Sequence, residues 1–319
     1  MPFHSEIASR LVLLDGIPSI AEALSSPAML RQLEAFDAYP GAVPPTGVIT
    51  QERSIPGPHG PIPVRIYFPE GWALQGRPGF IWMHGGAFRF GDLDMKEADW
   101  TARELVHRAG AVVVSVDYRL AVEGITFPVP LDDVVAAIRW VRENSEDLVM
   151  SSISVGGASA GANLAAGAAL RLRDEDNWAP EHLILVYPSM HADLPAPSKS
   201  LELALAQMLP VLRLPPEMFR SMRENYLGAL SSNPPGYSMP ALANVDGLPP
   251  TLVLNAEYDD FRASGEAFTA TLAAAGVDVE QALVRGMLHG FLNLPTSFEP
   301  VDDALERIAE RLRATRTTS

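Results

Sequence analysis

The stretch that decides the fold is GGASAGANLAAG at residues 156–167. Small side chains dominate it, and a buried helix would also favour alanine. Its first half, however, is a G-x-S-x-G motif centred on Ser159, between an apolar run typical of a strand (SISV) and a helical pattern over residues 160–173. A sharp turn at such a junction holds the serine in a strained conformation, and a side chain at Gly157 or Gly161 would clash. The crowding of small residues therefore predicts a nucleophile elbow with Ser159 as the nucleophile.

Strand-like and helix-like segments alternate on both sides of this elbow. Most of the expected strands are short, continuous apolar runs, which are typical of buried parallel strands. The alternation predicts an α/β protein with a mostly parallel central sheet and helices on both faces. Strands are expected at residues 64–68, 80–83, 111–116, 153–155, 183–187, 251–255 and 279–284, and helices at 97–109, 131–144, 160–173, 264–275 and 301–314.

Two segments do not follow the alternation. Residues 1–46 have an amphipathic helical pattern broken by prolines, and residues 190–245 combine many prolines with two helical pieces and no convincing strand. An insertion of that length inside a sheet protein is not expected to be a bare loop, so we interpret it as a lid, with a surface decoration as the alternative. The predicted organisation is cap helices at 1–46, a first core part at 47–189, a cap insertion at 190–245 and a second core part at 246–319.

A serine hydroxyl needs a base, and a base of this kind needs an orienting carboxylate. Among the histidines, His289 lies near glycines in a loop (GMLHGF) after the last predicted strand and before the last predicted helix. Three acids follow the strand TLVLN: Glu257, Asp259 and Asp260. The order Ser159, then an acid, then His289 is the chain order of the triad in α/β-hydrolases, but spacing alone does not separate the three acids.

A second glycine-rich loop, His84-Gly85-Gly86-Ala87, follows the strand FIWM. It is either a plain glycine turn or a loop whose backbone N–H groups bind a developing oxyanion, where side chains would obstruct the approach. Its position before the first main helix favours the second interpretation. The N–H groups of Gly85, Gly86 and Ala160 are therefore the expected oxyanion donors.

These motifs together resemble the hormone-sensitive-lipase family of carboxylesterases, which have the α/β-hydrolase fold with a helical cap. The likeness extends from about residue 50 to 315. HGGAFRFGD resembles the family's oxyanion motif, DYRLAVEGITFPVPLDD its DYRLAPE segment, GGASAGANLAA its elbow, AEYDDFRASGEAF its acid motif and GMLHGF its histidine motif. The resemblance assigns the acid to Asp259, and it makes a homodimer plausible through an edge strand at residues 279–284.

Five residues depart from the family pattern. Ala87 replaces the last glycine of the oxyanion motif, and Ala158 replaces an aspartate beside the nucleophile. Val122 replaces a proline, and Asp260 and Phe261 replace Pro and Leu after the acid. Because Asp260 could share charge with Asp259, the acid is assigned less securely than the nucleophile.

Composition excludes several classes of function. The net charge of −15 argues against nucleic acid and anionic membranes as partners, and the absence of cysteine excludes disulfides and thiolate chemistry. We expect a cytoplasmic protein that acts on a small-molecule ester and needs no metal or organic cofactor. Met208 and Leu209, in the apolar part of the lid, are expected to contact the substrate, although helical spacing alone would place such residues in the core.

The sequence thus predicts a serine carboxylesterase for short- to medium-chain acyl esters that works through an acyl-enzyme. An amidase, lactonase or deacetylase of a specialised metabolite would use the same triad and remains an alternative. A non-catalytic ligand receptor on the same fold is disfavoured, because the three triad residues are all present.

Overall fold

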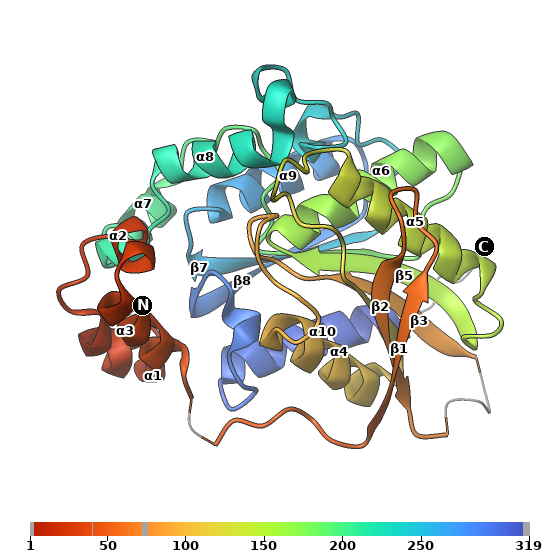
Figure 1. Ribbon diagram of the computed structural model, residues 1–319, viewed down its shortest axis with the longest axis horizontal. Coiled ribbons are helices and arrows are strands. Elements are labelled where there is room, and N and C mark those ends of the chain that lie inside the picture. The colour runs from red at the N-terminus through yellow and green to blue at the C-terminus, as the bar shows by residue number, and fades with distance from the viewer. Residues whose placement is uncertain (1–2, 40, 72–75, 315–319) are drawn as a thin grey trace.

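A computed structural model describes residues 3–39, 41–71 and 76–314. Its centre is an eight-stranded sheet with the strand order β1-β2-β4-β3-β5-β6-β7-β8 (Figure 1). β1 and β2 join the sheet antiparallel, and the strands from β4 to β8 pair in parallel. The carboxyl ends of the parallel strands meet at one edge of the sheet, which is where sites form in open α/β folds. The strands are β1 (Val48–Ile55), β2 (Ile62–Pro69), β3 (Arg77–Met83), β4 (Val112–Val116), β5 (Met150–Ala158), β6 (Leu183–Val186), β7 (Thr251–Tyr258) and β8 (Val279–Leu288).

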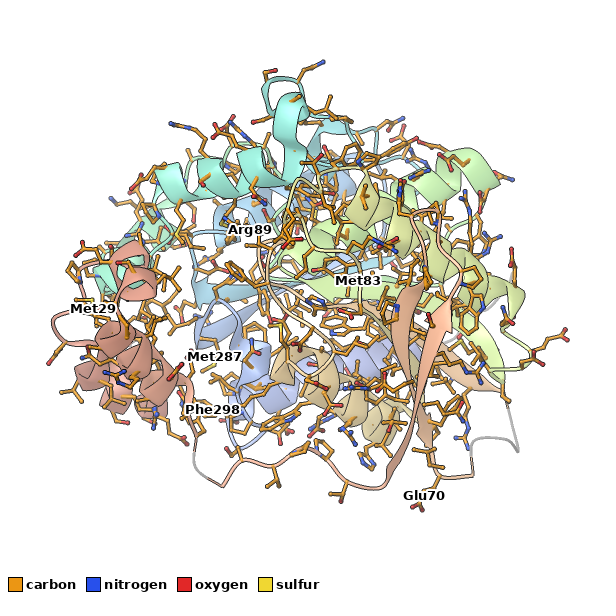
Figure 2. The ribbon with its side chains drawn as sticks, in the orientation of Figure 1. Met29, Glu70, Met83, Arg89, Met287 and Phe298 are labelled. Atoms are coloured by element: carbon orange, nitrogen blue, oxygen red, sulfur yellow. The ribbon has the colours of Figure 1, made fainter. Side chains whose placement is uncertain are left out.

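Helices cover both faces of the sheet and create two apolar cores. α5 (Val129–Glu143), α6 (Ala160–Asp176) and α9 (Arg262–Ala274) pack on one face, and α4 (Lys96–Ala109) and α10 (Glu299–Arg313) on the other (Figure 1). Successive residues of β3 alternate between the cores: Ile81 and Met83 face the first, and Phe80 and Trp82 face the second. Met83 lies in the interior of the molecule (Figure 2). Burial on both faces explains why the strand sequences are continuous apolar runs rather than alternating ones.

Each expected strand and each expected core helix is present, with ends that differ by a few residues. The α/β-hydrolase architecture predicted from the motifs is confirmed. The structure also has one strand that the sequence analysis did not predict, β1 at residues 48–55. It lies at the sheet edge with mostly exposed side chains, so its sequence (VITQERSI) lacks the apolar run that marks the buried strands.

The two segments outside the alternation are helical and lie at the same edge of the sheet. α1 (Ser5–Arg10), η1 (Leu11–Leu14), α2 (Ile20–Ser25) and α3 (Pro27–Asp37) form the N-terminal segment. The insertion contains α7 (Lys199–Leu205), η3 (Pro210–Leu212), α8 (Pro216–Leu227), η4 (Gly228–Ser232) and η5 (Pro240–Leu242). α2 contacts η3, so the two segments meet (Figure 1). The division into core and cap domains stays a prediction.

β8 is the last strand of the sheet, as the dimer prediction assumed. Its outer edge carries no neighbouring strand in the described part of the chain, while the homodimer itself stays a prediction. No helix within the described ranges has both the length and the apolar character needed to cross a membrane.

Candidate active site

Ser159 occupies the turn between β5 and α6. Its φ of 54° lies in the left-handed region, which non-glycine residues seldom adopt. A Cβ at Gly157 would lie 2.4 Å from the Gly161 carbonyl oxygen, and one at Gly161 would lie 2.2 Å from the Met83 oxygen. The turn therefore requires glycine at both positions, as the elbow interpretation predicted.

His289 follows β8 and joins Ser159 to an acid. Its Nε2 lies 3.0 Å from Ser159 Oγ, and its Nδ1 lies 2.8 Å from Asp259 Oδ2. The second carboxylate oxygen of Asp259 accepts the Phe261 N–H at 2.9 Å, and the Asp259 side chain is fully buried. A carboxylate held in this way fixes the tautomer with the proton on Nδ1, which leaves Nε2 free to accept the serine proton.

The electrostatics around His289 favour its cation. Burial alone would lower the pKa of His289, but the charge and hydrogen bond of Asp259 raise it, as do the charges of Glu97 and Asp260. The net result is a pKa above the ordinary imidazole value. The site is thus arranged to stabilise an imidazolium.

The three candidate acids have separate partners. Glu257 Oε2 accepts the Gly286 N–H at 2.7 Å. Asp260 binds Arg213 Nη2 at 2.8 Å and the Leu214 N–H at 2.8 Å. Of the three, Asp259 is the acid that contacts His289, which the spacing in the sequence could not distinguish.

The loop His84–Ala87 lies against Ser159, because a Cβ at Gly85 would come within 3.3 Å of the serine Cβ. The Gly85 N–H, however, donates to Glu97 Oε1 at 2.5 Å, so it is not available to an oxyanion and the expected donor set is wrong at this position. Among the described residues, the N–H groups of Gly86, Ala87 and Ala160 have no protein acceptor. Gly86 and Ala87 have positive φ values of 111° and 55°, a region of backbone conformation that favours glycine.

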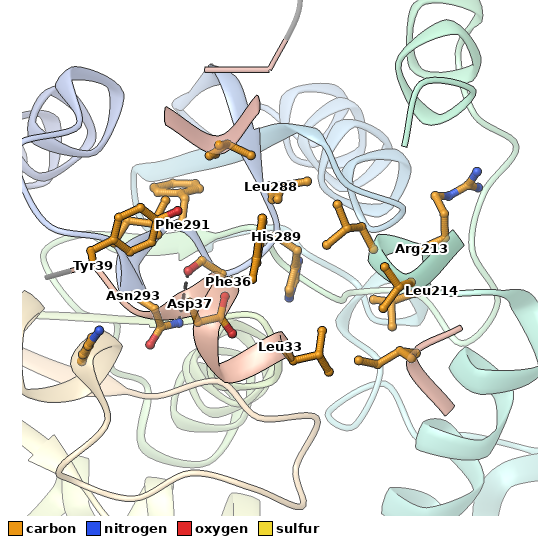
Figure 3. Close-up of a pocket in the computed structure, with 17 residues that line it drawn as sticks. Leu33, Phe36, Asp37, Tyr39, Arg213, Leu214, Leu288, His289, Phe291 and Asn293 are labelled. Carbon is orange, nitrogen blue, oxygen red and sulfur yellow. Dashed lines mark hydrogen bonds between the residues drawn. The ribbon is translucent and has the colours of Figure 1, made fainter. Parts of the chain in front are cut away.

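A cavity of about 480 Å³ opens beside His289 (Figure 3). Its walls come from the N-terminal helices, from residues 211–214 of the insertion and from residues 288–294. Met208 and Leu209 pack against the second core and do not line the cavity, whereas Val211 and Leu214 do. The contact of Met208 and Leu209 with substrate stays a prediction that this cavity does not support.

Sequence reasoning missed Glu97 and Tyr187. Glu97 is the second residue of α4 and is 2 % exposed, and Tyr187 follows β6 and is fully buried. The Tyr187 ring lies 4.8 Å from the His289 ring, and its hydroxyl donates to Glu97 Oε2. No spacing in the sequence connects these residues, because they meet only through the packing of α4 against the sheet.

The sequence matches known proteins over most of its length. The profile of a family described as alpha/beta hydrolase fold matches residues 80–293. Esterase LipI of Mycobacterium tuberculosis is 37% identical over 95% of this chain and 90% of its own, and carboxylesterase NlhH of the same organism is 34% identical over 95% of each. The solved structure of an esterase from Pyrobaculum calidifontis superposes with a TM-score of 0.78 at 29% identity, covering 98% of both chains.

Proposed function

Because the chain belongs to the α/β-hydrolase fold family, in the branch of esterases related to hormone-sensitive lipase, we propose that it is a carboxylesterase. It hydrolyses short- to medium-chain acyl esters through an acyl-enzyme on Ser159. The observation that carries this proposal is the pair of contacts from His289 to Ser159 Oγ, at 3.0 Å, and to Asp259, at 2.8 Å.

Each step has a group within reach. Ser159 Oγ attacks the ester carbonyl while His289 Nε2 takes its proton, and Asp259 stabilises the imidazolium that forms. The tetrahedral oxyanion accepts from the N–H groups of Gly86, Ala87 and Ala160. Its collapse expels the alcohol, which takes the proton from His289 and leaves the acyl group on Ser159. A water molecule then attacks the acyl-enzyme by the same route and releases the acid.

The proposal is tested by covalent trapping with a p-nitrophenyl dialkyl phosphate. We expect one phosphoryl adduct on the peptide that contains Ser159, with ester hydrolysis lost in proportion to labelling. A non-catalytic receptor would give neither an adduct nor turnover. A matched ester and anilide with the same acyl group then distinguish an esterase from an amidase, because both substrates form the same acyl-enzyme.

The direction of the His289 pKa predicts the acid limb of the pH profile. Neutral His289 is the base, so kcat/KM falls as the pH drops through its pKa in the free enzyme. Since that pKa is raised, the midpoint of the acid limb should lie above the ordinary value of about 6.5. The measurement is kcat/KM for p-nitrophenyl butyrate from pH 5 to 9, on enzyme shown to be stable over that range. A midpoint below the ordinary value would contradict the electrostatic account.

Substrate length should depend on the cavity wall. Each methylene buried against apolar side chains favours binding by about 0.8 kcal/mol, or about fourfold in kcat/KM, until the pocket is full. We therefore expect kcat/KM to rise from acetyl to about butyryl or hexanoyl esters and to fall for longer chains. Leu214→Ala should move the optimal acyl length to esters longer by about two carbon atoms, because the truncated side chain leaves space in the cavity.

Leu209→Ala is the matched control, because Leu209 belongs to the same insertion but does not line the cavity. Both variants and the wild-type chain are compared on p-nitrophenyl esters across acyl length. Peak activity on the longest esters would identify a lipase instead. An equal shift in both variants would show that the lid, and not the cavity wall, sets the cutoff.

A further inference from the structure

Glu97 is a buried carboxylate beside the catalytic residues, and the mechanism above does not use it. The residue is 2 % exposed, and no ion pair joins it to a Lys, Arg or His in the described part of the chain. A buried carboxylate without a cation is costly unless hydrogen bonds satisfy both oxygens. The donors that satisfy its two oxygens therefore indicate what this residue does.

Both donors to this carboxylate belong to the active site. Oε1 accepts the N–H of Gly85, in the loop that presents Gly86 and Ala87. Oε2 accepts the hydroxyl of Tyr187, whose ring contacts His289. Burial, followed by the charge of Glu97, raises the pKa of Tyr187 well above its ordinary value, so the hydroxyl remains protonated and continues to donate.

The backbone of Glu97 is also held in place. Its N–H donates to Asn293 Oδ1 at 3.1 Å, and its carbonyl accepts the Trp82 Nε1–H at 3.1 Å. Asn293 lies in η6 (Phe291–Asn293), shortly after His289, and Trp82 precedes the oxyanion loop. The carboxylate therefore has one position, between the loop that binds the oxyanion and the ring that carries the proton.

The charge of Glu97 acts on His289. The carboxylates whose charge raises the His289 pKa are Asp259 and Asp260, just after β7, and Glu97 on α4, and the Tyr187 ring contacts the imidazole. The other charged groups that line the cavity beside His289 are Asp37, Lys96 and Arg213. Arg213 pairs with Asp260 and offsets its charge. Glu97 is thus the second carboxylate, after Asp259, that favours the imidazolium without a cation of its own.

We propose that Glu97, held by Tyr187, is a positioning residue that fixes the oxyanion loop through Gly85 and stabilises the protonated His289 formed during catalysis. The catalytic part of this proposal rests on the proposed esterase function. The coupling between Glu97 and His289 does not, because it concerns the resting protein.

The test is Glu97→Gln, which keeps the shape and an acceptor for Gly85 but removes the charge. Glutamine can still bind Tyr187, because its amide donates to the hydroxyl oxygen. We expect kcat on p-nitrophenyl butyrate to fall about tenfold to hundredfold, with a smaller change in KM, since the lost interaction strengthens in the transition state. The acid limb of kcat/KM should move to lower pH, because the imidazolium loses one of the carboxylate charges that support it.

Asp99→Asn is the matched control. Asp99 is another buried carboxylate on α4 that accepts a tyrosine hydroxyl, from Tyr67, but it is paired with Arg103. Its replacement should leave the acid limb where it is in the wild-type chain. A fall in kcat without movement of the acid limb in Glu97→Gln would reduce Glu97 to a packing residue and overturn the proposal.

Two further measurements keep the proposal testable. If Glu97→Gln does not fold, Tyr187→Phe removes one donor and retains the ring, and wild-type kcat in that variant would overturn the proposal. NMR titration of the His289 imidazole gives a readout without turnover, and its pKa should be lower in Glu97→Gln. If the wild-type chain hydrolyses no ester while the His289 pKa is still lower in Glu97→Gln, the esterase function is refuted and the electrostatic coupling stands.

Discussion

Ser159→Ala is expected to leave a folded protein whose kcat on short esters is about 10⁴- to 10⁶-fold below that of the wild-type chain. The change removes the atom that attacks the carbonyl and the hydrogen bond of 3.0 Å to His289, and no other hydroxyl occupies that place in the elbow. Residual hydrolysis would come from the oxyanion donors acting on a bound water.

The control is Ser154→Ala, in β5, the strand that precedes the elbow. Ser154 is also buried, and its Oγ lies 3.4 Å from His182 Nδ1, so the chain contains a second serine–histidine contact of similar appearance. That variant should keep near wild-type kcat. Both proteins are compared by kcat on p-nitrophenyl butyrate, after purification from a host without background esterase and with melting temperatures checked. Near-normal turnover in pure Ser159→Ala would end the mechanism proposed here.

Asp259→Asn should lower kcat about 10⁴-fold, the size of effect that follows when the acid of a triad is replaced by its amide. The amide presents N–H groups to His289 Nδ1, which favours the tautomer with the proton on Nε2 and so leaves no base for Ser159. It also replaces the negative charge that stabilises the imidazolium in the transition state. Protein abundance and melting temperature distinguish this loss from unfolding.

Two variants at neighbouring acids provide the comparison. Asp260→Asn removes the charge that pairs with Arg213 and leaves one oxygen to accept from Arg213 and the Leu214 N–H, so it should loosen the cavity wall and change KM more than kcat. Glu257→Gln should do less, since the amide oxygen still accepts the Gly286 N–H. A larger loss of kcat in Asp260→Asn than in Asp259→Asn would mean that the acid is misassigned by one position.

The turn that carries Ser159 could be predicted from local sequence. Glycine is required on both sides of Ser159 because a Cβ would clash with backbone atoms a few residues away or in the adjacent strand. The structure has these close contacts at Gly157 and Gly161, as the sequence predicted. The buried strands were recognisable for a similar reason, because burial on both faces leaves a continuous apolar run. β1 was missed because an exposed edge strand is under no such constraint.

The oxyanion loop marks the limit of that reasoning. Glycines indicated where a backbone approaches a ligand, but not which N–H groups remain free to donate. Gly85 is committed to Glu97, a residue twelve positions along the chain, and this contact exists only because α4 packs its first turn under the loop. The insertion at residues 190–245 is a comparable case, since its apolar residues could be recognised from the sequence, but Val211 and Leu214, rather than Met208 and Leu209, line the cavity.

What the sequence determined by itself is therefore the α/β alternation, the turn that carries Ser159, and the order of Ser159, an acid and His289 along the chain. The first two follow from hydrophobic periodicity and local sterics, which act over a few residues, and the third from the order of motifs that the chain shares with α/β-hydrolases. Residue spacing did not separate the three acids, and the family motif assigned the role to Asp259. The tertiary structure shows the contact of Asp259 with His289, the N–H groups that have no protein acceptor and the residues of the insertion that line the cavity. Each of those depends on distances between groups brought together by the sheet, and a hydrogen bond of 2.8 Å between residues thirty positions apart leaves no trace in local spacing.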